Sequence, residues 1–457
     1  MLALAMFWAA GPAAAFCGTY VGDGASTLTN RASQIVIARE QGWTTLTMFN
    51  DYQGDLANFG LVVPIPDGVT SEDVRLSSRD LLEKLEGYSQ PRVVSYTCDD
   101  WYGVSEEARA AAGNQAWSGS GGGCGGGINY GARPPADDSG LAADTSGVVI
   151  EDQFDLGEYT AWIVSAEGGD GLSSWLNGQG FTIDAATGEV LGDYVEAGSH
   201  FLALRVDLDR LDDGDQWLSP LQVTYYAPDA WTLPLRLGAA NSAGVQDLVL
   251  YTLTAQDAGR VGIANYPETP APAAECLLDL GDAPLADWYE QQFEAATGLP
   301  ARPEDLDGRT GMAWVTEYGW SAGKCDPCTS AGPLQLEEMA ALGFQGGAYG
   351  SYFTRLHLRY TPDAMRQDIV LHESGLTANT QVRYVQHAWE LESDLPRCDG
   401  TVPDAPGTCY SSEYWARKAQ EGVAGTEVLA DEDDDDGCDG VLAMLLLPLG
   451  LAWRRRR

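Results

Sequence analysis

The sequence has few positive charges. Among its 457 residues, 26 are lysine or arginine and 67 are aspartate or glutamate, so the formal net charge at pH 7 is −41. Only Lys84, Lys324 and Lys418 are lysines. A nucleic-acid-binding surface needs a basic patch that neutralises phosphates. The composition therefore argues against nucleic acid as a partner, and it suits a soluble protein whose copies repel one another.

The common catalytic motifs are also missing. The sequence has no P-loop, and no Gly-x-Ser-x-Gly or dinucleotide fingerprint lies between a strand and a helix. Gly319 to Gly323 match Gly-x-Ser-x-Gly, but no helical pattern begins before Gly332. The glycine run Gly121 to Gly127 lacks the Lys-Ser/Thr of a phosphate loop. His372-Glu373 is not a zinc-protease motif, because Leu376 occupies the position of the second histidine. The sequence therefore predicts a non-enzymatic protein with no catalytic residues and no cofactor.

The longest apolar run near the C-terminus is short. Val441 to Trp453 contains 13 residues, and a helix of that length reaches about 20 Å, whereas a hydrocarbon core is about 30 Å thick. Four arginines follow the run and favour a cytoplasmic position for that end. The acidic run Asp431 to Asp436 and Cys438 precede it. This order predicts a transient membrane segment that a processing enzyme removes; the alternative is a buried C-terminal helix.

Three parts of this tail occur in the order of a known sorting signal. Gly437-Cys438, the apolar run and Arg454 to Arg457 resemble the C-terminal signals of myxobacteria, often called MYXO-CTERM. The resemblance implies cleavage near Cys438 by a sorting protease. It also implies display at the cell envelope, on the outer-membrane surface of a Gram-negative bacterium.

The N-terminus is typical of export. Leu2 to Ala15 is apolar, and Ala13-Ala14-Ala15 matches the small-residue pattern before a signal-peptidase site. We expect cleavage after Ala15, so that the mature chain begins at Phe16-Cys17.

The cysteines predict a disulfide framework. Nine cysteines are present, and eight remain if Cys438 belongs to the tail. An even number in an exported chain indicates disulfide bonds. Local pairing is the economical choice among many connectivities. It joins Cys398 with Cys409, Cys98 with Cys124 and Cys325 with Cys328, and it leaves Cys17 with Cys276.

One of these pairs has the spacing of a redox site. Cys325 and Cys328 form a C-x-x-C motif, in which a thiol–disulfide oxidoreductase lowers the pKa of one cysteine. A catalytic pair lies at the start of a helix, whereas here Thr329 to Gly332 follow before any helical pattern begins. We therefore interpret the pair as a structural disulfide, and an envelope oxidoreductase is the alternative function.

An acidic turn is a possible calcium site. Within Asp207 to Asp215 the candidate ligands are Asp207, Asp209, Asp213 and Asp215. The turn fails the EF-hand pattern, because Leu211 occupies the third ligand position. Calcium-dependent adhesion is therefore a second alternative function.

Three of the four histidines, His357, His372 and His387, lie on three candidate strands. If these strands are adjacent, the histidines converge and become candidate metal ligands. Arg355 and Arg359 share a strand face with His357. This basic face could bind an anion or an acidic glycan. We favour the simpler interpretation, a solvated face that neutralises nearby carboxylates.

The spacing of apolar residues predicts more strand than helix. Strands are expected at residues 34–39, 43–49, 60–65, 92–97, 148–154, 159–166, 201–207, 222–227, 248–253, 261–266, 352–360, 368–372 and 381–389. Helices are expected at 78–86, 173–177, 187–196, 284–297 and 333–342. The pattern predicts an α+β fold, mainly antiparallel meanders with a few short helices, stapled by disulfides. The first three strands and the last three are each expected to form a meander, with Glu40-Gln41-Gly42 as the hairpin turn between the first two. Gly298 is expected just past the end of the helix at 284–297.

Composition divides the chain into six segments. They are a signal peptide (1–15), an N-terminal part (16–117), a glycine-rich linker (118–147), a C-terminal part (148–397), a cysteine loop with an acidic linker (398–436) and the sorting tail (437–457).

The body of the chain also resembles a known family. Its ordered motifs are Cys17-Gly18, Asn50 to Gly54, Val62 to Pro66, Leu233 to Gly238, Gln246 to Leu248, Lys324 to Cys328 and Thr354 to Tyr360. Together they resemble a bacterial family catalogued as domain of unknown function 2330, from about Phe16 to Trp389. The family implies an exported protein and gives no known reaction. We therefore expect a surface-displayed protein with a binding, structural or adhesive role and an unidentified ligand.

Overall fold

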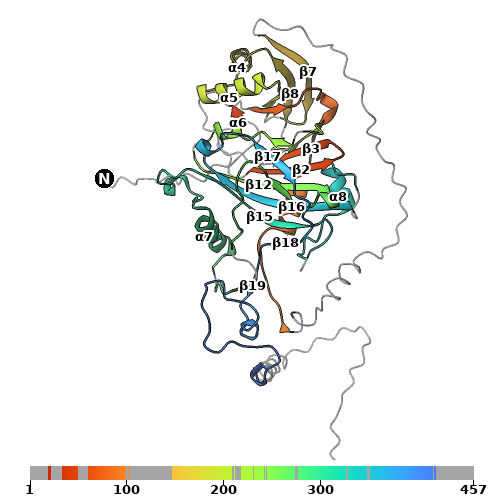
Figure 1. The fold of residues 1–457 in the computed structure, drawn as a ribbon. Coiled ribbons are helices and arrows are strands. Elements are labelled where there is room, and N and C mark those ends of the chain that lie inside the picture. The colour runs from red at the N-terminus through yellow and green to blue at the C-terminus, as the bar shows by residue number, and fades with distance from the viewer. Residues whose placement is uncertain are drawn as a thin grey trace, which may run out of the picture.

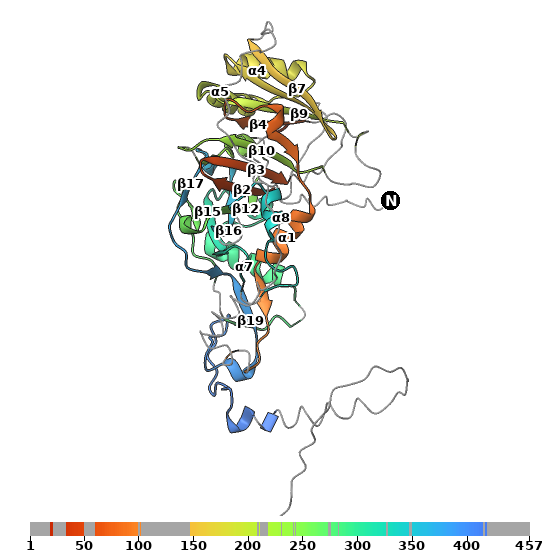
Figure 2. The ribbon, with the colours of Figure 1, turned by 90° about the vertical axis from the view of Figure 1, so that its right-hand side faces the viewer.

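The structure is a computed structural model. It describes residues 19–21, 33–49, 60–98, 101, 147–207, 210, 218–229, 231–240, 242, 244–272, 276–281, 283–325, 328–346, 350–414, 416 and 417. In this part of the chain the fold is α+β with mostly antiparallel sheets, as predicted. Two large sheets lie face to face, and helices cover their outer faces (Figure 1, Figure 2).

The smaller of the two sheets is antiparallel throughout. Its order is β1 (Thr19–Val21), β4 (Gly60–Ile65), β9 (His200–Val206), β8 (Tyr159–Ala166) and β7 (Val148–Leu156). The larger sheet has the order β18 (Thr380–Gln381), β15 (Met312–Ser321), β16 (Ser351–Tyr360), β12 (Gln246–Ala255), β2 (Ser33–Glu40), β3 (Trp43–Phe49), β10 (Leu221–Tyr226) and β5 (Val74–Leu76). Within it, β12 and β2 are parallel and the other neighbours are antiparallel.

The main core lies between these sheets. Leu61, Val63 and Ile65 of β4 pack in one cluster with Ile35, Leu250 and Leu356 of the larger sheet, among others. Val62 belongs to a second cluster, with Leu172 and Trp175 of the helix above. Successive side chains of β4 therefore point alternately into these two clusters, which explains why the strand is apolar throughout.

Helices form the two outer layers (Figure 2). α4 (Gly169–Gly178) and α5 (Ala185–Glu196) cover the smaller sheet. α1 (Asp80–Ser89), α7 (Leu285–Thr297) and α8 (Leu336–Ala341) lie on the outer side of the larger sheet. The short α6 (Arg236–Ala240) adds Leu237 to the cluster under α4 and α5.

Two small sheets complete the fold. β11 (Thr232–Leu233), β17 (Ile369–Glu373) and β13 (Val261–Ile263) are antiparallel. β14 (Leu277–Leu278), β19 (Arg383–Gln386) and β6 (Arg92–Val94) are parallel. The second small sheet lies beyond α7, at the lower end of the molecule as drawn (Figure 1).

Two predicted meanders differ from the structure. β2 and β3 form the expected hairpin, but β4 joins the other sheet. The three strands of the supposed last meander belong to three different sheets, where β16 pairs with β12 and β15, β17 with β11 and β13, and β19 with β14 and β6. In each case the strand pairs with a segment distant in sequence rather than with its neighbour.

Of the predicted linker (118–147), residues 118–146 lie outside the described residues and only Gly147 is described. The chain segments on either side of it share both large sheets, because β4 pairs with β9, and β2 and β3 pair with β12 and β10. The two parts therefore form one structural unit.

The disulfide pairing was predicted correctly for one pair. Cys325 bonds to Cys328 as expected. The pairs Cys398–Cys409, Cys98–Cys124 and Cys17–Cys276 are wrong, because the bonds formed are Cys98–Cys409 and Cys276–Cys398. Leu277 and Arg397 form a parallel bridge, which brings the adjacent Cys276 and Cys398 together. A contact between segments distant in sequence, rather than short spacing, therefore sets the pairing of Cys276 with Cys398. Cys17 and Cys124 lie outside the described residues.

Candidate functional site

The basic face of β16 is buried beneath α7. Arg355, His357 and Arg359 lie on one face as predicted, but Arg355 is 7% exposed and Arg359 only 2%. The face was expected to be solvated, and this expectation is wrong because α7 covers it. Phe293 of α7 stacks on His357, with ring centroids 4.1 Å apart.

Glu317 brings a negative charge to this face. The pairing of β15 with β16 shifts register between Thr316 and Tyr318, so Glu317 is the extra residue of a β-bulge. Its carboxylate accepts a hydrogen bond from Arg355 Nε at 2.6 Å and lies 3.1 Å from His357 Nδ1. The hydroxyl of Tyr289 on α7 donates to the same carboxylate. The bulge thus places Glu317 between the two basic side chains.

Asp247 and Glu290 complete the network. Arg359 donates to Asp247 through Nε and Nη2 at 2.9 and 3.1 Å, and to Glu290 through Nη1 and Nη2 at 2.6 and 2.8 Å. His357 Nε2 lies 3.0 Å from Asp247 Oδ1. Three basic groups therefore face three carboxylates from β12, β15 and α7. We call this the buried ion network.

The ionisation of the network follows from this geometry. Burial opposes the charged form of Glu317, but the positive charges of Arg355 and His357 outweigh it and lower its pKa to about 2. Burial also opposes charge on His357, but Glu317 and Asp247 raise its pKa to about 9. Burial and the charge of Glu317 raise the pKa of Tyr289 well above its usual range. All these groups have partners in the fold, so the network stabilises the structure rather than offering an anion site.

Stability should therefore fall at alkaline pH. Because the pKa of His357 is raised to about 9 in the folded state, its contribution is complete below about pH 6.5 and is lost as the pH rises through 9. The rise in the pKa of His357 corresponds to a loss of up to about 3 kcal/mol of unfolding free energy over this pH range. Urea unfolding between pH 6 and 10 measures it. The His357→Gln variant should lose less stability over this range; parallel curves for the two proteins would contradict the assignment.

The three predicted histidine ligands do not converge. His357 lies in the buried ion network, whereas His387 Nε2 contacts Glu392 Oε1 at 3.0 Å beyond the end of β19. His372 lies on β17, against Gly262 of β13. Among the residues that the structure describes, no group of three or more His, Cys, Asp or Glu side chains is placed to hold a metal ion.

Only one of the four predicted calcium ligands is described. Asp207 pairs with Arg210 at 3.1 Å, and Arg210 also pairs with Asp155 at 2.9 Å. Asp209, Asp213 and Asp215 lie outside the described residues, as do Ala15 and Cys438.

The surroundings of the C-x-x-C motif match the sequence-based interpretation. Cys325 and Cys328 are bonded to each other, and Cys328 is exposed. The next helix, α8, begins only at Leu336. The pair therefore lacks the helix N-terminus that stabilises a catalytic thiolate.

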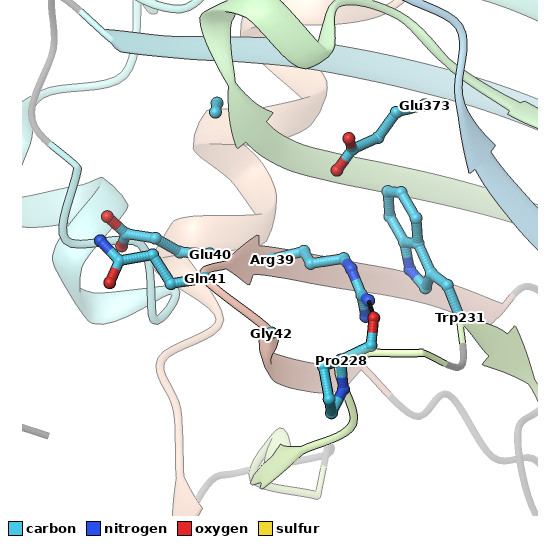
Figure 3. Close-up of a pocket in the computed structure, with 8 residues that line it drawn as sticks. Arg39, Glu40, Gln41, Gly42, Pro228, Trp231 and Glu373 are labelled. Atoms are coloured by element: carbon cyan, nitrogen blue, oxygen red, sulfur yellow. Dashed lines mark hydrogen bonds between the residues drawn. The ribbon is translucent and has the colours of Figure 1, made fainter. Parts of the chain in front are cut away.

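An open pocket that no sequence pattern indicated lies beside the β2–β3 turn (Figure 3). Its volume is about 450 Å³. In the close-up Glu40 and Gln41 lie on one side, Glu373 and Trp231 lie on the other, and Arg39 extends between them. The lining residues are Arg39, Glu40, Gln41, Gly42, Pro228, Trp231, Ala255 and Glu373. We call this the turn pocket.

Local hydrogen bonds hold the polar wall of the turn pocket. Arg39 donates to the carbonyl oxygens of Pro228 and Ala227 at 2.9 and 3.2 Å and to Thr44 Oγ1 at 3.0 Å. Its guanidinium carbon lies 5.1 Å from the ring centroid of Trp231. Glu40 accepts a hydrogen bond from the backbone N–H of Gln345 at 2.9 Å. The side chains are therefore positioned before any ligand arrives.

The backbone of the turn itself is tightly defined. Gln41 and Gly42 have φ angles of 52° and 85°, as in the two-residue turns that join antiparallel strands. A Cβ atom at Gly42 would lie 2.8 Å from the ring of Tyr226 and 3.1 Å from Pro228. Glycine therefore lets the turn lie against the segment that carries the opposite wall.

Comparison with protein families gives a clear assignment. The family described as "Uncharacterized protein conserved in bacteria (DUF2330)" matches residues 11–372. The chain belongs to this family. No match emerges from the curated proteins.

Among solved structures, the chain is similar to one described as baculovirus P35, at 9% identity and a TM-score of 0.21, with 79% of this chain and 98% of the other covered. A TM-score this low carries no argument about fold or function. No helix of the DUF2330 protein in its described part is long and apolar enough to cross a membrane.

Proposed function

We propose that this DUF2330 protein is an exported, non-enzymatic binding protein displayed at the cell envelope, and that it binds its ligand in the turn pocket. The main support for export is the pair of long-range disulfides, Cys98–Cys409 and Cys276–Cys398, which join residues 311 and 122 positions apart. Such bonds form and persist in oxidising compartments and are rare in the cytosol.

The distribution of polar groups supports a binding role. The acids and bases of the buried ion network hydrogen-bond one another beneath α7. Arg39 and Glu40 of the turn pocket also have hydrogen-bond partners, but the pocket's polar groups border an open space of about 450 Å³, which is a size typical of small-ligand sites.

The route to the surface follows from the two ends of the sequence. Signal peptidase would cleave after Ala15, and a sorting protease would process the tail near Cys438. The apolar run Val441 to Trp453 would hold the chain at the membrane until that step. Asp431 to Asp436 would then connect the folded body to the envelope.

Thiol trapping and surface labelling of intact cells test this proposal together. We expect a membrane-impermeant reagent to label the protein, and alkylation without reduction to leave Cys98, Cys276, Cys398 and Cys409 unmodified. Mass spectrometry of the labelled protein should find no peptide containing Arg454 to Arg457. Reduced thiols in a cytosolic fraction would contradict export, and surface protein that retains the four arginines would contradict processing of the tail.

A second function, envelope thiol–disulfide exchange, is favoured by the exposure of Cys328 in a formed disulfide. The same trapping experiment separates the two functions. An exchange enzyme would show a reduced fraction of Cys325 and Cys328 and mixed disulfides with other proteins, whereas a structural bond would remain oxidised.

A further inference from the structure

The turn pocket combines groups that donate hydrogen bonds with groups that accept them. Glu40 and Glu373 carry acceptor oxygens, and the exposed amide of Gln41 offers both donors and an acceptor. The terminal nitrogens of Arg39 already donate to the loop carbonyls and to Thr44. Trp231 and Pro228 add apolar walls. A ligand that fills this space therefore needs polar groups of both kinds, together with apolar surface.

Charge limits the choice of ligand. Two carboxylates and one guanidinium line the pocket, and the whole chain carries a net charge of −41. This field repels a polyanion. A cation would meet the guanidinium of Arg39, which already lies 5.1 Å from the centre of the Trp231 ring. A neutral ligand with several hydroxyl groups avoids both conflicts.

Aromatic rings extend the site beyond the pocket. Tyr226 is 57% exposed, and its ring lies 5.4 Å from that of Trp43, centroid to centroid. The pocket's own Gly42 lies against Tyr226. Exposed aromatic rings next to a polar pocket offer flat apolar surface with little loss of conformational freedom on binding.

We propose that the turn pocket binds a neutral saccharide, with its hydroxyl groups on Glu40, Gln41 and Glu373 and its C–H groups against the part of Trp231 that lines the pocket. The exposed ring of Tyr226 would contact a further sugar unit, so an oligosaccharide should bind more tightly than a monosaccharide. This inference rests on the binding role proposed above and names the ligand class of that site.

Calorimetric titration of the mature protein tests the ligand class. The probes are maltohexaose, cellohexaose and chitohexaose as neutral sugars, polygalacturonate as an anion and spermine as a cation. We expect binding of at least one neutral sugar and weaker binding of the matching monosaccharide. Binding of spermine or polygalacturonate alone, or of none of the probes, would overturn the proposal.

Two variants locate the site. Glu373→Gln changes an exposed side chain, so it should fold normally and weaken sugar binding about tenfold. Trp231→Ala should weaken it at least as much, with folding checked separately because Trp231 also packs against the main core. Glu304→Gln is the control, because Glu304 is exposed and does not line the pocket. Equal affinities for the wild type and Glu373→Gln would place the sugar elsewhere.

Failure here is distinguishable from failure of the proposed function. Envelope location and oxidised cysteines are measured without any sugar. A surface-displayed protein that binds none of the neutral sugars would retain the export proposal and lose only the ligand class.

Discussion

The Glu317→Gln variant should lose about 3–5 kcal/mol of unfolding free energy. The carboxylate is 2% exposed and faces Arg355 at 2.6 Å and His357 at 3.1 Å. The glutamine keeps the shape of the side chain but removes its charge, so the buried guanidinium of Arg355 loses its closest anionic partner. Urea unfolding at pH 7 measures the loss.

A matched control separates this effect from a general effect of removing a carboxylate. Glu337 is exposed on α8, so Glu337→Gln should change stability by less than about 0.5 kcal/mol. The Glu317→Gln variant should also lose less stability between pH 7 and 10, because without Glu317 the pKa of His357 returns toward its usual value. Similar small losses for both variants would mean that the network contributes little.

Removing the Cys98–Cys409 bond should have the second large effect. The double variant Cys98→Ala/Cys409→Ala should lose about 2–5 kcal/mol, because a bond between distant residues restricts the unfolded chain most. Cys276–Cys398 still holds the chain as far as Cys398. The segment beyond Cys398 should therefore open first.

Hydrogen exchange and a second pair of variants check this prediction. The backbone amides of Ser393 and Gly407 bond to the Gly407 carbonyl oxygen and to Glu392, so they should lose protection before those of the large sheets. Cys325→Ala/Cys328→Ala opens a bond between residues only 3 positions apart and should cost less than about 2 kcal/mol. Equal losses for the two double variants would contradict this account.

Local sequence patterns predicted several helices and strands, but not the segments with which these strands pair. Alternation placed Arg355, His357 and Arg359 on one face of β16, and the Gln41-Gly42 turn predicted the β2–β3 hairpin. α7 ends at Thr297, and Gly298 after it has a φ of 73°, the left-handed conformation expected just past a helix. These features depend on neighbouring residues alone.

The site residues that were missed depend on distant contacts. β15 carries a signal that was overlooked, because residues 312–321 are rich in aromatic and β-branched side chains. Its bulge at Glu317 has no comparable signal, since only pairing with β16 reveals it. Arg39 and Trp231 belong to segments almost 200 residues apart, and no local pattern indicates that they line one pocket. For the same reason, the sequence did not predict the pairing of Cys98 with Cys409.

The position of β2 in the larger sheet has a consequence for the timing of folding. This early strand lies between β3 and β12, and β12 in turn requires β16 on its other side. β2 (33–40) therefore lacks one neighbouring strand until β12 has been synthesised, at residue 255. β12 in turn lacks its second neighbour until β16 is complete, at residue 360. Sheets built from such distant segments form slowly. The N-terminal half of the chain consequently remains incomplete during most of its synthesis, a state in which a polypeptide can still be threaded through a narrow channel.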